Sequence, residues 1–184
     1  MESRADLTSE KEIVANKLVL CYNIRMEKLN KARLFAIKAH EDQLYAGKPY
    51  IFHLTQVVNV LQEFDYDTDT DLLVAGYLHD TLEDTKVVPA QIQKEFGMHV
   101  YEMVFAVSGF GSTRANRTEN TVKKLHDYPA AIALKMADRL ANMRFSSKDS
   151  KKHFNMYVDE LPKYEELFYG PMYEEMKLFK KVLE

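Results

Sequence analysis

The sequence predicts an all-α fold, a single-domain helical bundle. Glycine and proline are scarce, at six and five residues, whereas an antiparallel β protein of this size needs more turn residues. Apolar residues recur at spacings of three and four along several segments, and no segment alternates apolar and polar residues as a half-buried strand does. The 184-residue chain is long enough for one domain with a substantial core.

The chain is expected to divide into three parts. Residues 1–25 are predicted to form an N-terminal helical extension, with Thr8 or Ser9 as its N-cap. Residues 26–148 form the main domain, and residues 149–184 form C-terminal helices packed on it. Within the main domain, helical periodicity and the positions of glycine and proline predict helices at residues 26–40, 53–64, 71–82, 89–97, 99–110, 121–126 and 130–145.

The net charge, the cysteine count and the lack of long apolar runs limit the cellular compartments and the binding partners that we expect. The net charge of −3 gives no electrostatic reason to expect nucleic acid or an anionic membrane as a partner. Cys21 is the single cysteine, so an internal disulfide is excluded and a reducing cytoplasm is the simplest compartment. The first residues are too polar for a signal peptide, and no apolar run approaches the roughly 20 residues of a transmembrane helix. We therefore expect a soluble cytoplasmic protein.

Ionisable residues interrupt three otherwise apolar helices. His53 begins one helix, His79 and Asp80 close a second, and Asp138 lies inside a third. Buried charges are costly unless they are paired or bind a metal ion. Imidazole nitrogens and carboxylate oxygens together suit one divalent cation, and such a mixed set leaves coordination positions open for substrate. The pattern therefore predicts a metal site.

Two more carboxylates follow Asp80 at helical spacing. Glu83 and Asp84 lie three and four residues further on, so all three share one helix face, where they can orient a water and move its proton. Each residue alone has a commoner explanation: a helix cap for His53, or an ion pair with Lys135 or Arg139 for Asp138. The combination is what indicates a functional site.

The order His, His-Asp, Asp resembles the HD superfamily of metal-dependent phosphohydrolases. The segments "KAHEDQLYAGKPYIFHLTQVV", "VAGYLHDTLEDT" and "ALKMADRLANMR" are more narrowly similar to the hydrolase domain of RelA/SpoT-type alarmone enzymes and their small single-domain relatives. This resemblance covers residues 31–144. It implies a helical HD domain that uses manganese to remove the 3′-pyrophosphate from guanosine polyphosphates, converting ppGpp into GDP and pyrophosphate.

The resemblance also implies roles for individual residues. The metal ligands would be His53, His79, Asp80 and Asp138. Glu83 and Asp84 would position and activate the attacking water, and Asn142 would contact the nucleotide. Two residues of the loop before His53 would lie beside the site: Lys48 and Tyr50.

Three departures from the family pattern concern the substrate. The segment after Gln43 is uncharged, which leaves Tyr45 as a stacking partner for the base; Phe145 stands where a small polar residue is common; and "AVSGFG" lacks the usual threonine and charged residue. Two alternatives therefore stay open. One is an HD phosphohydrolase for another nucleotide, such as the 2′-phosphate of NADPH, a deoxynucleotide or a cyclic dinucleotide. The other is a catalytically silent nucleotide-binding module.

Two further regions have candidate roles. The polar segment 109–120 is predicted to be a loop, and its Arg114 and Arg117 are candidates for binding a polyphosphate, because the guanidinium fork suits phosphate oxygens. A solvated loop is the alternative. The C-terminal helix carries an apolar stripe that can pack on the domain or on an identical subunit, which leaves monomer and homodimer open: Met172, Met176, Leu178, Phe179 and Leu183.

Overall fold

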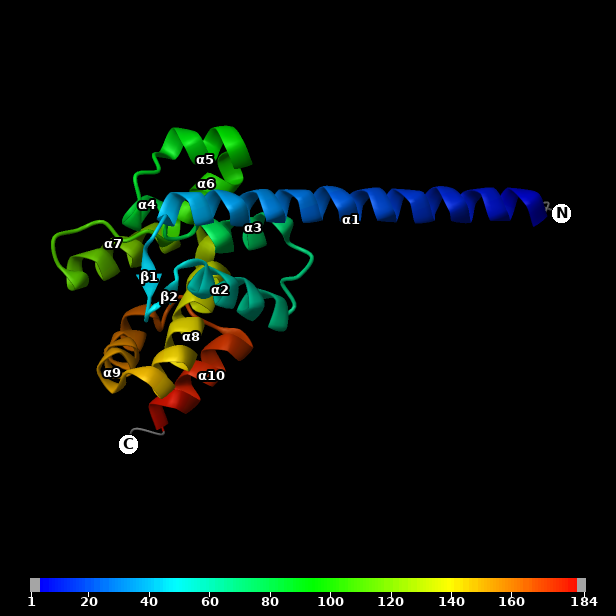
Figure 1. Cartoon of the computed structure of the whole chain (residues 1–184). Coiled ribbons are helices and arrows are strands. Elements are labelled where there is room, and N and C mark those ends of the chain that lie inside the picture. Colours follow the sequence, from blue (N-terminus) through cyan, green and yellow to red (C-terminus); the bar gives the residue numbers. More distant parts are fainter. Residues whose placement is uncertain (1–3, 182–184) are drawn as a thin grey trace.

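The computed structural model describes residues 4–181, with side chains from residue 12 onward, and confirms the all-α prediction (Figure 1). The α-helices are α1 (Arg4–His40), α2 (Ile51–Glu63), α3 (Thr70–Leu78), α4 (Thr81–Asp84), α5 (Pro89–Phe96), α6 (Met98–Val107), α7 (Arg114–Asp127), α8 (Ile132–Asp149), α9 (Lys151–Glu160) and α10 (Gly170–Lys181). Two short 3₁₀ helices, η1 (Pro129–Ala131) and η2 (Leu161–Tyr164), join them.

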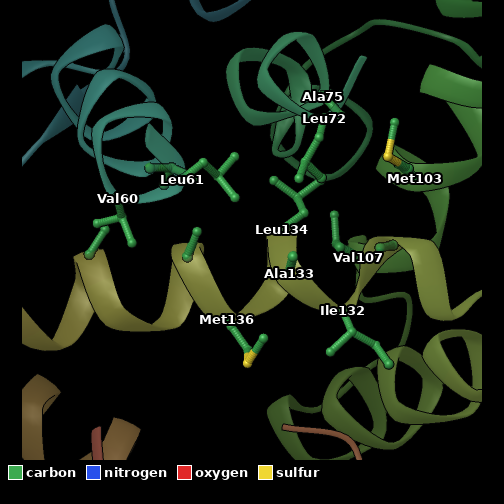
Figure 2. Close-up of a cluster of buried hydrophobic side chains, with 14 of the residues drawn as sticks. Val60, Leu61, Leu72, Ala75, Met103, Val107, Ile132, Ala133, Leu134 and Met136 are labelled. Atoms are coloured by element: carbon green, nitrogen blue, oxygen red, sulfur yellow. The ribbon is translucent and has the colours of Figure 1, made fainter. Parts of the chain in front are cut away.

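Helix α8 runs through the middle of the body, and it packs against α2, α3, α6, α9 and α10. Figure 2 shows one part of the core, where side chains of α2, α3 and α6 meet the apolar face of α8. The residues labelled there are all buried: Val60, Leu61, Leu72, Ala75, Met103, Val107, Ile132, Ala133, Leu134 and Met136. This packing fixes α2, α3 and α8 against one another, and these are the helices from which the candidate site is built.

Helix α1 extends well beyond the body that the other helices form. Its C-terminal part packs against α3 through Leu29, Ala32 and Ala36, whereas its N-terminal part projects into solvent (Figure 1). The helix begins at Arg4, so the prediction of an N-cap at Thr8 or Ser9 is wrong. It continues through residue 25 without a break, and the predicted division of the chain into three parts stays a prediction.

The segment between α1 and α2 forms a small hairpin. Strands β1 (Leu44–Tyr45) and β2 (Lys48–Pro49) pair antiparallel across Ala46 and Gly47. Both turn residues have positive φ, 48° and 79°, a conformation that glycine adopts without strain. The hairpin places Tyr45 over the start of α2, where His53 lies.

Several predicted helices have other bounds in the structure: the helix expected at residues 99–110 ends at Val107, and the one expected at 130–145 continues to Asp149. The helix expected at residues 71–82 is interrupted at His79–Asp80, which separate α3 from the single turn α4. Helix α7 begins at Arg114 rather than near residue 121, because the Thr113 hydroxyl accepts a hydrogen bond from Asn116 N–H and caps it. Arg114 and Arg117 therefore lie on a helix and not in a loop.

Helices α9 and α10 lie beside the lower part of α8 in Figure 1. Met172 and Met176 of α10 are buried, and Arg144 of α8 bonds both Glu63 of α2 and Glu175 of α10. The predicted stripe residue Leu178 is exposed, and Leu183 lies outside the described residues. Among the described helices, none combines the length and apolar character needed to cross a membrane.

Candidate metal centre

Four side chains from separate elements converge at the C-terminal end of α3. His53 lies in the first turn of α2, His79 and Asp80 form the break between α3 and α4, and Asp138 lies within α8. Asp80 Oδ2 is 3.1 Å from His79 Nε2 and 3.5 Å from His53 Nε2. Asp138 Oδ1 is 3.4 Å from His53 Nε2 and 3.6 Å from His79 Nε2. The four predicted ligands therefore surround one point.

The geometry of His79 fits a metal ion at that point. Its Nδ1 donates to the Gly76 carbonyl oxygen over 2.9 Å, which leaves the lone pair of Nε2 directed at the other three side chains. This Nε2 is buried and has no hydrogen-bond partner among the described residues. Candidate ligand atoms of His53, His79 and Asp80 all lie within 4.8 Å of one another. This donor set suits a divalent metal.

The pKa shifts of Asp80 and His79 also indicate a site that attracts a cation. Burial acts to raise the pKa of Asp80, but His79 and His53 outweigh it and lower that pKa. Burial likewise acts to lower the pKa of His79, but Asp80 and Asp138 raise it well above its ordinary value. The carboxylates of the partly buried Asp80 and the buried Asp138 thus draw positive charge to this point, and a divalent cation supplies such charge.

Neighbours on α8 hold Asp138 in place. Asn142, one turn further along, donates to Asp138 Oδ1 over 2.6 Å, and Lys135, one turn back, lies 3.0 Å from Oδ2. Burial acts to raise the pKa of Asp138, but Lys135 and the two histidines lower it well below its ordinary value. Each carboxylate oxygen therefore has a fixed partner, and Oδ1 faces the histidines.

The acidic pair lies beside the four convergent residues. Glu83 Oε1 accepts a 2.6 Å hydrogen bond from Gly109 N–H, and the Tyr50 hydroxyl donates to both Asp80 Oδ2 and Asp84 Oδ2, over 2.7 and 3.0 Å. Burial, reinforced by the charge of Asp80, raises the pKa of both Glu83 and Asp84. Carboxylates with raised pKa values are suited to exchange protons near neutral pH.

Aromatic side chains cover the other side of the site. Tyr45 stacks on the His53 ring at 4.7 Å, and its hydroxyl donates to Asn142 Oδ1 over 2.9 Å. Tyr157 of α9 donates to the same oxygen over 3.1 Å. Phe145 contacts the Tyr45 ring at 5.1 Å. Tyr45 and Asn142, both predicted to contact substrate, are thus bonded to each other next to His53.

The remaining predicted substrate residues lie further out. Lys48 sits 4.0 Å over the Phe52 ring. Arg114 makes a two-point contact with Glu160, with its Nε 2.5 Å from Oε1. Arg117 is half-buried, and its guanidinium donates to the Gly111 carbonyl oxygen over 3.5 Å. A phosphate role for Arg114 requires its guanidinium to leave Glu160, and the roles of all three residues stay predictions.

A cleft of about 1010 Å³ opens beside the acidic pair. It lies between the end of α1, the segment after α4, and α5. Besides Glu83 and Asp84, its lining includes His40, Lys38, Lys86 and Lys94. This space gives a ligand access to the two carboxylates.

Sequence reasoning overlooked three contributors. Tyr157, which bonds Asn142, carries no signal in the sequence because it lies 15 residues away on another helix. Gly109 donates to Glu83 through its backbone N–H, so its residue type gives no signal in the sequence. His40 stacks on Tyr50 at 4.2 Å and bonds Gln43 over 2.8 Å, and its spacing of three from Gln43 was the one visible clue.

Comparison with known proteins agrees with this arrangement. The family model described as "HD domain" matches residues 32–161, which include all four convergent side chains. The chain belongs to the HD domain family. The resemblance found in the sequence is therefore confirmed.

Individual relatives of this HD domain are larger proteins. The chain is 31% identical over 150 residues to guanosine-3′,5′-bis(diphosphate) 3′-pyrophosphohydrolase of Aquifex aeolicus, an alignment that covers 78% of this chain and 21% of that protein. It is 34% identical over 140 residues to the bifunctional (p)ppGpp synthase/hydrolase SpoT of Escherichia coli strain K12, covering 70% of this chain and 20% of SpoT. The chain thus spans about a fifth of the length of these curated relatives.

A solved structure of nearly the same size shows the same fold. It is described as "A metazoan ortholog of SpoT hydrolyzes ppGpp and plays a role in starvation responses". The superposition has a TM-score of 0.75 at 21% sequence identity, and it covers 84% of this HD protein and 94% of that chain. The HD fold therefore extends over most of both chains.

Proposed function

We propose that this protein is a divalent-metal-dependent nucleotide phosphohydrolase, and that it acts as a 3′-pyrophosphohydrolase on guanosine polyphosphates, converting ppGpp into GDP and pyrophosphate. The observation that carries the proposal is the convergence of His53, His79, Asp80 and Asp138 around the unpartnered Nε2 of His79. The names of the relatives, a pyrophosphohydrolase and SpoT, support the choice of substrate.

The four convergent residues are the proposed metal ligands, and Mn²⁺ is the proposed metal, as the mixture of imidazole and carboxylate donors permits. A bound divalent cation would supply Lewis-acid chemistry, because it neutralises phosphate charge and makes water more acidic. Asn142 and Lys135 keep Asp138 in its orientation, since they occupy its two oxygens from either side.

The proposed reaction uses Glu83 and Asp84 for proton transfer. Water attacks the phosphorus bonded to the 3′-oxygen of the ribose, and the bond between that phosphorus and the 3′-oxygen breaks. The 3′-oxygen is the leaving group and remains on GDP, and the oxygen of the water becomes part of the released pyrophosphate. The carboxylate pair accepts the proton of the water and returns a proton to the 3′-oxygen, so that the acids regain their starting state. The Gly109 N–H and the Tyr50 hydroxyl hold the two carboxylates for this exchange.

A second candidate is hydrolysis of another nucleotide by the same centre. The specific observation is the aromatic surface beside Asn142, where Tyr45 contacts both His53 and Phe145. Many alarmone hydrolases are expected to carry a charged segment at this place, whereas this surface is aromatic. The nucleotide base that this surface prefers therefore has to be tested separately from the metal chemistry. The 2′-phosphate of NADPH, a deoxynucleotide and a cyclic dinucleotide are the substrates to compare.

One assay separates these candidates. The purified protein is loaded with Mn²⁺ and incubated with each nucleotide, and pyrophosphate and phosphate are measured separately. We expect pyrophosphate from ppGpp, loss of activity in Asp138→Asn, and normal activity in the matched variant Asp127→Asn, whose residue is exposed on α7. Hydrolysis of another nucleotide, detected as released phosphate or polyphosphate or, for a cyclic dinucleotide, as its linear product, with ppGpp unchanged, would assign the second candidate. Metal-loaded, folded protein that hydrolyses none of them but binds nucleotide would be a silent binding module.

A further inference from the structure

The segment of residues 108–110 connects the end of α6 with the acidic pair of the candidate site. Gly109 is buried, and its N–H donates to Glu83 Oε1 over 2.6 Å. The segment follows the last residue of α6 and lies outside the helices, where a backbone is ordinarily more mobile. A backbone N–H holds a carboxylate in one place only if the backbone is itself held. The contacts of segment 108–110 therefore decide how firmly Glu83 is positioned.

Lys124 of α7 binds the same peptide group from its other end. Its Nζ donates to the Phe105 carbonyl oxygen over 2.6 Å and also to the Ser108 carbonyl oxygen. The Ser108 carbonyl and the Gly109 N–H belong to one planar peptide group, so this rigid unit is bonded to Lys124 at one end and to Glu83 at the other. Hydrogen bonds at the two ends of a peptide group polarise each other, and a cation on the carbonyl therefore makes the N–H a better donor.

The ammonium group of Lys124 is enclosed by protein groups. The carbonyls at the C-terminal end of α6 carry partial negative charge, which favours a cation there. The rings of Phe105 and Phe110 lie 4.5 and 4.7 Å from Nζ, distances typical of cation–π contacts. Burial lowers the pKa of Lys124 to about 8, and the negative charge of Glu83 acts to raise it. Lys124 is thus partly withdrawn from water and lies near the carboxylate.

Helix α7 also contacts the rest of the segment. Asn120 Oδ1 accepts a 3.1 Å hydrogen bond from Phe110 N–H. A Cβ on Gly109 would lie 3.0 Å from Arg117 Cβ and 3.2 Å from Thr121 Oγ1, so the backbone of the segment rests directly on the helix. Lys124 supplies the charged contact of this arrangement, at the peptide group that bonds Glu83.

We propose that Lys124 is a positioning residue for Glu83: by binding the Ser108 carbonyl it fixes the peptide group whose N–H holds the Glu83 carboxylate for proton transfer. The inference rests on the proposed phosphohydrolase function. It gives Lys124 no contact with substrate, because its ammonium group is directed at backbone carbonyls and aromatic rings. Lys124 acts on the reaction only through Gly109 and Glu83.

The neighbouring Lys123 provides a matched control. It is exposed, and it lies about 100° around the helix from Lys124. Lys124 follows the buried Thr121 by three residues, which places it on the face of α7 that packs on α6. The two lysines carry the same charge. Comparing their variants therefore separates the contact with Ser108 from a general loss of positive charge on α7.

The first test observes the Gly109 N–H by NMR and needs no enzymatic activity. A short hydrogen bond to a carboxylate moves the amide proton resonance downfield and slows its exchange with solvent. We expect Lys124→Met to move this resonance upfield, in the same direction as Glu83→Gln, and to speed its exchange. Lys123→Met should change neither. Thermal unfolding checks that each variant folds, and Lys124→Gln gives the same test should Lys124→Met fail to fold. An unmoved Gly109 resonance in the folded Lys124 variant overturns the proposal.

The second test measures hydrolysis of ppGpp by the Mn²⁺-loaded protein. We expect Lys124→Met to lower kcat about tenfold, a part of the roughly 100- to 10,000-fold that a positioned acid or base contributes, and to leave KM nearly unchanged. Lys123→Met should keep both constants. A raised KM with unchanged kcat would assign Lys124 to phosphate binding and overturn the proposal. If the unmodified protein hydrolyses no nucleotide, the proposed function is wrong, and the Gly109 resonance still decides whether Lys124 fixes Glu83.

Discussion

The hydroxyl of Tyr50 lies 3.0 Å from Asp84 Oδ2, and it bonds Asp80 at the same time. The tyrosine ring is held from behind by His40, which stacks on it at 4.2 Å. One phenol group therefore links a candidate metal ligand with a candidate proton-transfer carboxylate. The hydrogen bond from Tyr50 favours the ionised form of Asp84, and so it counteracts the rise in the pKa of Asp84 that burial and Asp80 cause.

Tyr50→Phe is expected to shift the pH dependence of hydrolysis. Without the hydroxyl, the pKa of Asp84 rises further, so the rate falls at a higher pH on the acidic side. We also expect kcat to fall about tenfold or more, since a hydrogen bond to a charged group contributes about 1.5–3 kcal/mol. The measurement is the pH profile of kcat/KM with metal content determined in parallel. Tyr169→Phe, at an exposed tyrosine, is the matched control, and an unshifted acidic side in Tyr50→Phe would contradict the role of this bond.

Metal binding is expected to stabilise the fold. Mn²⁺ at about 100 times its dissociation constant adds about 2.7 kcal/mol to the free energy of unfolding, which corresponds to roughly 5–10 °C in Tm. His79→Asn should abolish this increase, because Nε2 of His79 is buried, has no hydrogen-bond partner among the described residues and lies close to Asp80 and Asp138. The same substitution at the exposed His126 should preserve it. Thermal unfolding with and without Mn²⁺ measures both, and equal shifts in the two variants would place the metal elsewhere.

Glu160 is expected to contribute strongly to stability. It bonds the buried Arg139 over 2.8 Å and the more exposed Arg114 over 2.5 Å. Glu160→Gln leaves Arg139 without its counter-charge, and breaking a buried pair in this way costs about 3–5 kcal/mol. Glu174→Gln, which removes a surface pair with Lys177, should cost less than about 1 kcal/mol. Urea unfolding measures both free energies.

The contacts of Glu160 with Arg114 and Arg139 also predict that the free energy of unfolding depends on pH. Burial acts to raise the pKa of Glu160, but Arg114 and Arg139 outweigh it, and the pKa in the folded protein lies below the ordinary value of 4.5. The stabilisation is therefore fully present above the unfolded-state pKa and is lost as the pH falls through the lower, folded-state pKa. Glu160→Gln should lack this component of acid unfolding. An identical acid dependence in the variant and the unmodified protein would argue against it.

Gly76 is expected to resist enlargement. A Cβ at this position would lie 2.9 Å from Val58 Cγ2, so α2 and α3 approach too closely for a side chain. Gly76→Ala should lower the free energy of unfolding by about 1–3 kcal/mol through overpacking. Combining it with Val58→Ala removes the clashing methyl group, and the double variant should lose less than the sum of the two single variants. Additive losses, measured by urea unfolding, would show that the contact is not the cause.

The sequence was sufficient for the helical class, because apolar spacing reports directly on which helix faces are buried. It also identified the residues of the candidate site. Histidines and carboxylates inside apolar segments such as "GYLHDTLEDT" are rare enough to indicate a shared partner. The structure brings His53, His79, Asp80 and Asp138 together, although 58 residues separate Asp80 from Asp138. Their roles as ligands stay predictions.

Other features lie beyond sequence reasoning for physical reasons. The start of α7 depends on the hydroxyl of Thr113, one of several polar residues in its segment that could have capped a helix. The pairing of Arg114 with Glu160 depends on how α7 packs near the end of α9, where η2 begins, and no local pattern encodes this packing. The contact of Tyr157 with Asn142 likewise follows from the placement of α9 on α8.

The spacing of the site residues on α8 determines which mutations the candidate metal centre can tolerate. One continuous helix places three side chains on the same face, because Lys135, Asp138 and Asn142 are separated by three and four residues. Adding or deleting one residue between Asp138 and Asn142 would turn everything beyond it by about 100°. Substitutions can vary the surroundings of this centre, but the length of that single turn has to remain constant.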